Sequence, residues 1–274
     1  MELRDAIIKL YDANPKEYES FDRAIYNEFI EELNRGQIRA AEKIDGKWGV
    51  NAWVKMGILI GFRMGKLTAI KGGGEKVFFD KDTLPEKKID LEDRIRIVPG
   101  GTSIRNGCYL APGVTIMPPA FVNIGAYVDS GTLIDSHALV GSCAQVGKDV
   151  HLSAGAMLGG VLEPIGSRPV IIEDGVFIGG NSGIYEGVIV QREAILAAGT
   201  ILTSSVPVYD AVRRCYLSKE ADQAVTIPER AVVVSGGRPL NGRPDFHVYC
   251  PIIIKYRDAK TEASVALEQD LRDS

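Results

Sequence analysis

The chain has 274 residues, of which 45% are hydrophobic and 25% are charged, and its formal net charge is −4. This balance gives no reason to expect nucleic acid or an anionic membrane surface as a partner. The longest apolar run, from about Met56 to Phe62, is far too short to span a membrane, and the charged N-terminal stretch lacks the apolar core of a secretion signal. We therefore expect a cytoplasmic protein whose four cysteines are reduced thiols.

The first third of the chain predicts a small α/β domain over residues 1–95. Two amphipathic helices are expected within residues 1–37, one before Pro15 and one that ends near Gly36. From Arg39 to Phe79 the pattern favours short strands and turns, most clearly in KIDGKWGV (43–50) and VKMGILIGFRM (54–64). The glycines at 72–74 mark a loop, and residues 79–94 predict a charged linker with a helical turn. We expect this domain to cap one end of the repeat that follows.

A six-residue repeat begins at Val98 and dominates the middle of the chain. Every sixth residue is a branched aliphatic, first in one run of eleven and then, after a gap, in a run of seven: Val98, Ile104, Leu110, Ile116, Val122, Val128, Ile134, Val140, Val146, Leu152, Leu158, and Ile172, Ile178, Ile184, Val190, Leu196, Leu202, Val208. A short fixed period of this kind is typical of repeat architectures. Six residues suit one short strand and one turn, and three such units close a triangular coil.

The other repeat positions support a β-helix. The fifth position of each hexad is mostly small or β-branched, as a narrow interior requires. The fourth position favours Gly, Asn and Asp, which tolerate the positive φ of a tight corner. The sequence therefore predicts a mainly β fold, with a β-helix of hexapeptide repeats over residues 96–212.

Two segments interrupt or follow the repeat. Leu158 and Ile172 are fourteen residues apart, which exceeds two hexads by two, so we expect a loop insertion near 159–171. Insertions in solenoids often form the binding face. Residues 213–274 predict a C-terminal β/α cap, with strands at Ala231–Val234 and Tyr249–Tyr256 and a helix from about Glu262 to Leu271.

Several strings resemble the tetrahydrodipicolinate N-succinyltransferases, a family of lysine-pathway acyltransferases. The longest is VNIGAYVDSGTLIDSHALVGSCAQVGKDVHLSAG (122–155). The likeness extends over most of the chain through AEKIDGKW (41–48), GGVLEP (159–164), IIEDGVFIG (171–179), YEGVIV (185–190), VVVSGG (232–237) and KYRDAKT (255–261). The hexads alone indicate only the superfamily of hexapeptide-repeat acyltransferases, whereas these strings are specific for the succinyltransferase family.

The resemblance implies a fold, an assembly and a reaction. It implies that the β-helix is left-handed and that three chains form a homotrimer with active sites between neighbouring β-helices. It implies transfer of succinyl from the co-substrate succinyl-CoA to the amine of a ring-opened dicarboxylic amino acid, giving N-succinyl-2-amino-6-ketopimelate. No permanently bound cofactor and no metal are implied.

Asp135 and Arg96 are the first site candidates. The reaction needs a base for the attacking amine, donors for the thioester oxyanion and cations for the substrate carboxylates. Asp135 matches the family's active-site aspartate, although a polar wall residue would also be ordinary at the second hexad position. Arg96 matches the substrate-contacting arginine in R-x-V-P, and Arg105 is a nearby alternative if the register differs.

The second acidic residue of the family is missing at its usual place. Relatives commonly carry an acid three positions before the glutamate of a VEG string, and here that position is Gly183. Glu186 is therefore the second catalytic candidate, and its ordinary interpretation is an exposed wall carboxylate.

Three further residues of the repeat have side chains that could take part in chemistry. His137 stands at a corner position that otherwise favours glycine, and a role in shape is the favoured interpretation. His151 is a candidate for a polar contact. Cys143 also stands at a corner, and we interpret it as structural, because direct attack by an amine needs no covalent intermediate.

The CoA arm is expected along the later coils. Gly180, Ala198 and Gly199 would leave room there for pantetheine. Possible phosphate partners, which could equally be ordinary solvated charges, are Arg213, Arg214, Lys255 and Arg257.

Three other functions remain open at this level. The nearest is an acetyl-CoA-dependent N-acetyltransferase acting on the same or a related amine. A γ-type carbonic anhydrase would use the same coil with three histidines and zinc, but only two of the chain's three histidines lie in the repeat. The third is a non-catalytic β-helix subunit.

Overall fold

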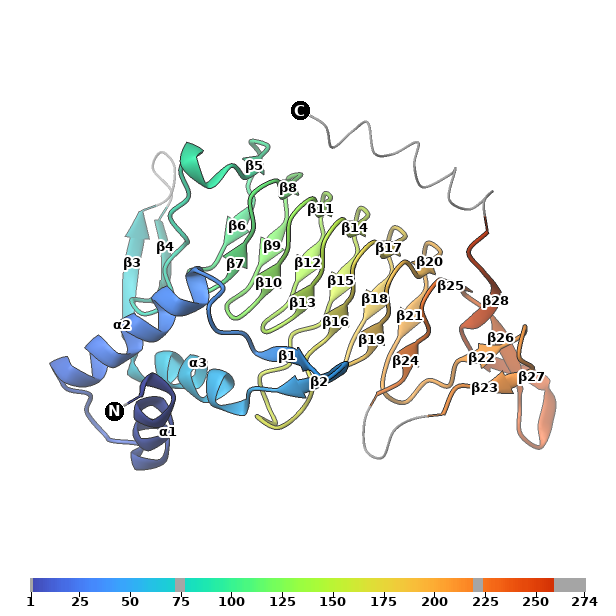
Figure 1. Cartoon of the computed structure of the whole chain (residues 1–274), viewed down its shortest axis with the longest axis horizontal. Helices are drawn as coiled ribbons and strands as arrows, with labels where there is room; N and C mark the ends of the chain where they lie inside the picture. The colour runs from blue at the N-terminus through green and yellow to red at the C-terminus, as the bar shows by residue number, and fades with distance from the viewer. Residues whose placement is uncertain (1, 72–76, 219–223, 259–274) are drawn as a thin grey trace.

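The hexad repeat folds as a three-sided coil that runs the length of the molecule (Figure 1). The structure is a computed structural model that describes residues 2–71, 77–218 and 224–258. Each turn of the coil adds one two-residue strand to each of three parallel sheets. The predicted left-handed parallel β-helix is confirmed as the fold of the chain.

We call the three sheets A, B and C, in the order in which the chain passes through them. Sheet A contains β5 (Arg96–Ile97), β8 (Thr115–Ile116), β11 (Leu133–Ile134), β14 (His151–Leu152), β17 (Phe177–Ile178) and β20 (Ile195–Leu196), and four later strands extend it. Sheet B contains β6 (Ser103–Ile104), β9 (Phe121–Val122), β12 (Leu139–Val140), β15 (Met157–Leu158), β18 (Gly183–Ile184) and β21 (Ile201–Leu202). Sheet C contains β7 (Tyr109–Leu110), β10 (Tyr127–Val128), β13 (Gln145–Val146), β16 (Ile171–Ile172), β19 (Ile189–Val190) and β24 (Thr226–Ile227).

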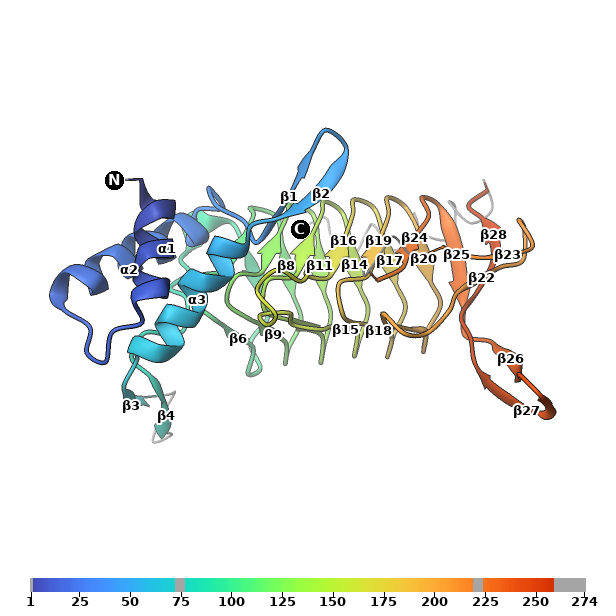
Figure 2. The ribbon, with the colours of Figure 1, turned by 90° about the horizontal axis from the view of Figure 1, so that it is seen from below.

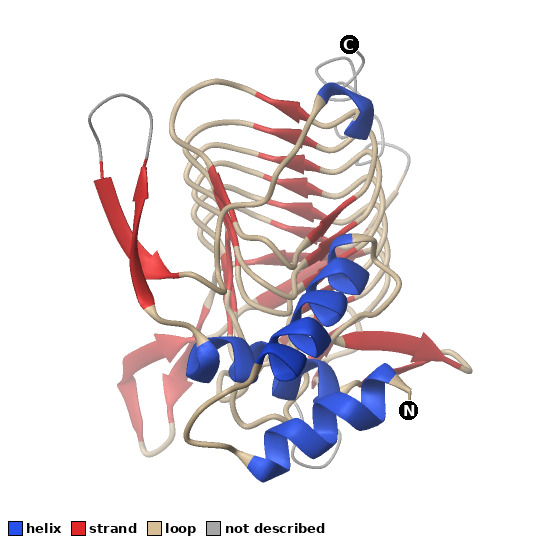
Figure 3. Ribbon diagram, turned by 90° about the vertical axis from the view of Figure 1, so that its left-hand side faces the viewer, coloured by secondary structure: helices blue, strands red, loops and turns tan. Residues whose placement is uncertain are grey.

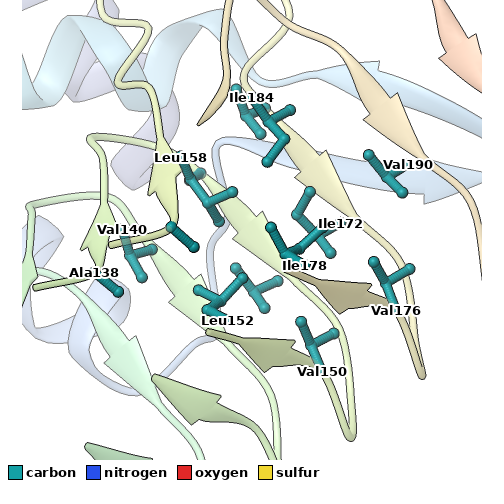
Figure 4. Close-up of a cluster of buried hydrophobic side chains, with 14 of the residues drawn as sticks. Ala138, Val140, Val150, Leu152, Leu158, Ile172, Val176, Ile178, Ile184 and Val190 are labelled. Carbon is teal, nitrogen blue, oxygen red and sulfur yellow. The ribbon is translucent and has the colours of Figure 1, made fainter. Parts of the chain in front are cut away.

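The interior of the coil is filled by the first residues of the hexads. Leu152, Leu158 and Ile178 have no exposed surface and stack on their equivalents in the neighbouring coils (Figure 4). Burying one such side chain stabilises the fold by about 1.5–3 kcal/mol, so the repeat is its own core. Small residues of the fifth position, such as Ala138, lie between the large ones.

Three helices gather at the N-terminal end of the coil (Figure 3). They are α1 (Leu3–Ala13), α2 (Ser20–Asn34) and α3 (Ala52–Met64). The first two confirm the predicted helices. The prediction of strands over 54–64 is wrong. Gly57 and Gly61 are one helical turn apart, and on α3 they let Phe29 and Tyr26 lie directly against the backbone.

Three hairpins project from the N- and C-terminal parts of the chain. Figure 2 shows most clearly the hairpin of β1 and β2 (residues 41–50) and the hairpin of β26 and β27 (residues 237–249). β1 (Ala41–Ile44) and β2 (Lys47–Val50) form an antiparallel pair, which we call the arm, and Trp48 of the arm packs against Ile171 and Ile189 on sheet C. β3 (Leu67–Lys71) pairs with β4 (Val77–Lys81). The expected helical turn in the linker is a 3-10 helix at Leu91–Asp93.

The interruption of the repeat is an insertion at one corner. Ile172 pairs with Val146, twenty-six residues earlier, where an undisturbed coil spans eighteen. The fourteen residues from Leu158 to Ile172 are therefore one hexad plus an insertion of eight residues. The sequence predicts two hexads plus an insertion of two residues, and that prediction is wrong. The ladder of sheet B continues across it, since β15 pairs with β18.

The C-terminal segment extends sheet A and adds the third hairpin. The strands that extend sheet A are β22 (Tyr209–Asp210), β23 (Cys215–Tyr216), β25 (Ala231–Val234) and β28 (Ile252–Tyr256). β26 (Gly237–Leu240) and β27 (Arg243–Tyr249) form the hairpin. The expected helix from Glu262 lies outside the described residues. Across the described ranges, no helix has the length and apolar character needed to cross a bilayer.

Candidate active site

Two of the three long edges of the coil carry the predicted site residues. The aspartate edge is the corner between sheets A and B, and it is defined by Asp135, Gly180, Ala198 and Gly199. The loop edge is the corner between sheets B and C, and it is defined by Cys143, the insertion 159–170 and Glu186. Sheet B separates the two edges, so one chain does not bring Asp135 and Glu186 together.

Asp135 directly follows β11 and opens the turn that leads to β12. Its backbone N–H donates to the Leu152 carbonyl at 2.9 Å, which fixes the residue to the next coil. Its Oδ1 accepts a hydrogen bond from the Ser136 backbone N–H at 2.6 Å. The side chain is half-buried. The turn thus holds one carboxylate oxygen and leaves the other able to accept a proton from a substrate.

The predicted CoA contacts lie along the same edge. Gly180 is two coils beyond Asp135, and Ala198 and Gly199 are three coils beyond it. The Gly199 N–H donates to the Gly180 carbonyl at 2.9 Å, which continues the corner from coil to coil. Ala198 and Gly199 are exposed and Gly180 is half-buried. The structure therefore places all three on a shallow edge of small residues that runs away from Asp135.

Arg96 lies on sheet A at the start of the coil. It is exposed and pairs with Thr115, which in turn pairs with Leu133, the residue two positions before Asp135. Its backbone lies two strand spacings, about 10 Å, from that of Leu133. An extended arginine side chain that binds one carboxylate of a dicarboxylate substrate can span this distance. The alternative, Arg105, forms an ion pair with Asp80 and so joins the coil to the N-terminal region.

Glu186 follows β18 on the loop edge. Its backbone has a positive φ of 54°, and its side chain is exposed. One carboxylate oxygen accepts hydrogen bonds from the Ser204 backbone N–H at 2.8 Å and from the Ser204 hydroxyl. Glu186 therefore ties two neighbouring corners together, and one of its oxygens is already engaged.

A cavity of about 950 Å³ lies on the loop edge beside Glu186. The insertion forms one wall, and the corner after β18 forms the other. The lining residues are Val50, Gly159, Gly160, Val161, Glu163, Pro164, Gly166, Ser167, Arg168, Tyr185, Glu186, Gly187, Thr203, Ser204 and Ala224. The expected role of the insertion at a binding face agrees with this placement.

The insertion is held near its C-terminal end by two long basic side chains. Lys55 of α3 has no exposed surface, and its ammonium donates to the Ser167 carbonyl. Burial lowers the pKa of Lys55, and the nearby Cys143 partly opposes that effect. Arg168 donates from Nε to the Gly187 carbonyl and from Nη2 to the Ala224 carbonyl, both at 2.8 Å. The loop is thus built into the wall of the cavity.

The three other repeat candidates differ in exposure. His137 is exposed at its corner, with a φ of 62°. His151 is buried on sheet A, and its ring centroid lies 4.8 Å from that of Phe177. Cys143 is fully buried against the N-terminal helices, and burial raises the pKa of its thiol to about 12. A thiol in that environment stays protonated, which agrees with a structural role.

Most of the basic residues proposed for the CoA phosphates have protein partners. Arg213 lies 3.6 Å from the buried carboxylate of Asp210. Arg257 donates to the Glu193 carbonyl at 3.2 Å, and Lys255 lies 3.3 Å from Asp258. Arg214 is exposed. These contacts stabilise the C-terminal cap. That the four residues bind the phosphates of CoA stays a prediction.

Comparisons with known proteins identify the family. The family described as "Tetrahydrodipicolinate N-succinyltransferase N-terminal" matches residues 2–64, and the "Hexapeptide repeat of succinyl-transferase" matches residues 169–204. A 2,3,4,5-tetrahydropyridine-2,6-dicarboxylate N-succinyltransferase of Burkholderia mallei is 41% identical over 267 residues, which is 95% of this chain and 93% of that protein. The chain belongs to the tetrahydrodipicolinate N-succinyltransferase family.

Other members of the tetrahydrodipicolinate N-succinyltransferase family give the same match. The Paraburkholderia phymatum protein of the same name is also 41% identical over 95% of the chain. A solved Campylobacter jejuni structure, titled as a putative tetrahydropyridine-2-carboxylate N-succinyltransferase, is 17% identical with a TM-score of 0.45 and covers 91% of this chain and 65% of its own. That structural likeness is too low to add to the sequence match.

For a tetrahydrodipicolinate N-succinyltransferase, the structure adds residues that sequence reasoning missed. These are Lys55, Ser204 and Tyr185. A lysine in an apolar helix and a serine in a turn gave no signal, because their partners are distant in sequence. Tyr185 precedes Glu186 in the string YEG, and its place against Gly159 and Gly183 depends on how the coils stack. Among the residues that the structure describes, no group of three or more His, Cys, Asp or Glu is arranged to hold a metal ion.

Proposed function

We propose that this chain transfers succinyl from succinyl-CoA to the amino group of ring-opened tetrahydrodipicolinate, in lysine and diaminopimelate biosynthesis. The products are N-succinyl-2-amino-6-ketopimelate and CoA. The observation that carries the proposal is the 41% identity to the Burkholderia mallei protein of that activity over 95% of the chain. Asp135 supports it, since the carboxylate lies half-buried on the same edge as the small residues Gly180, Ala198 and Gly199.

The reaction is a direct transfer between two substrates. The amine nitrogen attacks the thioester carbonyl carbon, a C–N bond forms, and the C–S bond breaks. The proton lost by the nitrogen goes to Asp135, and CoA leaves as a thiolate that is protonated afterwards. Amine and thioester react without a resident cofactor, so succinyl-CoA acts only as a co-substrate. Arg96 would bind a carboxylate of the acceptor through a bidentate pair.

We further propose that the active site forms between chains of a homotrimer. Asp135 and Glu186 lie on different edges of one coil, so a second copy must supply the loop edge that faces an aspartate edge. A convex prism has no deep cleft at its aspartate edge, and a neighbouring coil would close one. Size-exclusion chromatography with light scattering should give three times the mass of the chain, whereas an active monomer would overturn this assembly.

The thioester is assigned to the aspartate edge. Gly180, Ala198 and Gly199 would lie along pantetheine, because side chains this small let an extended chain approach the backbone. Of Arg213, Arg214, Lys255 and Arg257, the exposed Arg214 is proposed as a phosphate contact. We place the reaction in the cytoplasm, a reducing compartment that suits four cysteines without disulfide bonds.

The acyl-donor assay tests the function. Purified protein should release CoA thiol from succinyl-CoA only when the acceptor, or 2-aminopimelate as a stable mimic, is present. Turnover with acetyl-CoA that is equal or faster would replace the succinyl assignment with the acetyltransferase alternative. Release of CoA without any acceptor would contradict an amine transferase altogether.

A further inference from the structure

A cavity of about 630 Å³ lies in the N-terminal domain, outside both edges of the coil. Three segments form it: the loop between α1 and α2, the first turn of α2, and the C-terminal end of α3 with the two residues that follow. Figure 1 shows these segments at the end of the molecule opposite the C-terminal cap. The described residues that line the cavity all precede the hexad repeat. The succinyl transfer proposed above therefore gives this cavity no role.

The lining of this cavity, which we call the cationic cavity, is rich in positive charge. Each of the three segments contributes, and the cations are Lys16, Arg23, Arg63 and Lys66. Glu17 is the carboxylate that lines the cavity with them. Arg23 forms an ion pair with Asp82 at 3.1 Å, whereas no described carboxylate lies within 4.0 Å of the charged groups of the other three. In a chain whose net charge is −4, this cluster creates a local positive potential that attracts anions.

Contacts within the N-terminal domain hold the two arginines in place. The Arg63 guanidinium lies over the ring of Tyr11, 4.3 Å from its centroid, and Nη1 donates to the Tyr11 carbonyl at 3.4 Å. Asp82 accepts from Arg23 through one carboxylate oxygen, and through the other it accepts from the Lys66 backbone N–H at 2.8 Å. The walls are thus positioned before any ligand arrives, which lowers the entropic cost of binding.

Tyr18 adds a polar group whose hydrogen bonding is incomplete. It is half-buried and lines the cavity, and its hydroxyl oxygen is buried with no hydrogen-bond partner in the part of the chain that the structure describes. Burial raises the pKa of Tyr18, the charge of Arg63 opposes this, and the charge of Asp22 adds to it. The phenol therefore stays protonated at neutral pH and can donate a hydrogen bond. A buried donor without an acceptor is destabilising, and an anion in the cavity would supply the acceptor.

We propose that the cationic cavity binds a small organic anion that carries two or more carboxylate or phosphate groups. Guanidinium groups such as those of Arg23 and Arg63 bind these groups in a bidentate manner, and the two lysines add charge on longer, more adaptable side chains. The volume lies within the range of small-molecule sites, about 300–1,000 Å³, so there is room for more than a single inorganic ion. The inference is independent of the proposed function, because no step of succinyl transfer uses these residues.

Isothermal titration calorimetry of the full chain with sodium pyrophosphate at low ionic strength tests the proposal. We expect one anion to bind per chain, and the affinity should fall as NaCl is added, because salt screens the attraction. Arg63→Gln should weaken binding at least about tenfold, and Lys66→Gln, which changes an exposed side chain outside the core, about threefold.

Arg35→Gln is the matched control for these variants. Arg35 is an exposed arginine of the same domain that pairs with Glu31 and Glu32 and does not line the cavity. Its replacement should leave the affinity for pyrophosphate unchanged. Absence of binding to the wild-type protein would overturn the proposal. Binding that Arg63→Gln and Lys66→Gln leave unchanged would place pyrophosphate elsewhere on the chain and would overturn it as well.

Tyr18→Phe separates a ligand contact from a structural role, because it keeps the ring and removes only the hydroxyl. We expect the affinity for pyrophosphate to fall about tenfold. The Tm of the ligand-free protein should stay the same or rise, since the variant loses a buried donor that has no partner. A lower Tm with unchanged affinity would contradict the site as proposed.

The same titration with citrate distinguishes the two kinds of anionic group. Tighter binding of pyrophosphate than of citrate would assign a phosphate-bearing ligand to the cavity. The reverse order would assign a polycarboxylate, and the Arg63→Gln variant should weaken whichever anion binds more tightly.

Discussion

The aspartate edge and the loop edge are built from the same repeat, yet they differ in almost every other respect. Backbone hydrogen bonds connect corner to corner on both edges, and on the aspartate edge the later corners carry the small residues Gly180, Ala198 and Gly199. The loop edge is covered by helices near Cys143 and then widened by the insertion, which Lys55 and Arg168 hold. The regular corner gives a shallow edge, whereas the cavity of the loop edge is formed by an insertion and by the long side chains that anchor it.

The largest effect expected from a single substitution is at Asp135. Asp135→Asn removes the proposed base and should lower kcat at least about a hundredfold, with an unchanged Tm. Asp129→Asn is the matched control, because Asp129 also follows a strand and accepts a hydrogen bond from the next backbone N–H, Ser130, at 2.7 Å. Asp129 lies on a third edge, between sheets C and A. Equal losses in both variants would assign the effect to the turn and not to catalysis.

A smaller effect is expected for the anchor of the insertion. Lys55→Met keeps a long buried side chain but removes the hydrogen bond to the Ser167 carbonyl. We expect kcat/KM to fall about tenfold and cleavage by added protease within 159–170 to become faster. The Tm should change little, since a buried ammonium is costly to desolvate and methionine is not. Unchanged proteolysis would show that Arg168 alone holds the loop.

Glu186→Gln should have a comparable or milder effect. The amide oxygen can still accept from the Ser204 N–H, so only the charge is lost. We expect a loss of activity of several-fold, roughly 3–10 times, from the weaker hydrogen bonds of a neutral acceptor. Ser204→Ala should give a loss of similar size if Glu186 acts by joining the two corners. A hundredfold loss for Glu186→Gln alone would make Glu186 a second catalytic group equal to Asp135.

The smallest effect is expected for the arm, the hairpin of β1 and β2 that packs on sheet C. Glu173 on sheet C accepts hydrogen bonds from Lys43 Nζ and Trp48 Nε1, each at 2.8 Å, and from the Arg192 backbone N–H at 3.1 Å. Burial by itself would raise the pKa of Glu173, but these hydrogen bonds outweigh it and hold the pKa below its usual range. Glu173 therefore stabilises the folded arm above its ordinary pKa near 4.5, and this contribution is lost as the pH falls through the lower folded-state value.

Trp48 fluorescence reports that loss directly. In a Trp53→Phe background, lowering the pH below about 4.5 should shift the Trp48 emission as the indole leaves the carboxylate. Glu173→Gln should abolish the pH dependence of this shift, because its amide does not titrate in that range. An identical acid transition in the Gln variant would show that the transition belongs to the whole fold.

The regular part of the structure was predictable because its cause is local. A branched aliphatic at every sixth position is needed wherever a coil stacks on itself, so Val98 to Leu158 already specify which side of each strand is inside. The places of Gly180, Ala198 and Gly199 relative to Asp135 could not be predicted in this way, because the insertion between them lengthens one coil by eight residues and so hides which edge the later coils occupy.

The irregular parts depend on contacts that sequence spacing does not reveal. Gly57 and Gly61 suggested turns, and only the presence of Phe29 and Tyr26 shows why glycine is needed inside a helix. Lys55 meets Ser167 across a separation of more than a hundred residues, which no periodic pattern encodes. The ring of Tyr185 lies against Gly183 and Gly159 because neighbouring coils stack, and the spacing of the hexads does not reveal such a contact.

The continuous ladder of sheet B makes the distance along the axis between the corners of Asp135 and Glu186 a whole number of coils. β12, which begins just after the Asp135 turn, and β18 are separated only by β15, so their backbones are about 10 Å apart along the axis. The eight extra residues at the loop edge change the shape of the cavity and leave this distance as it was. Evolution can therefore vary the pocket in single-residue steps, while the spacing along the axis changes only by gain or loss of an entire eighteen-residue coil.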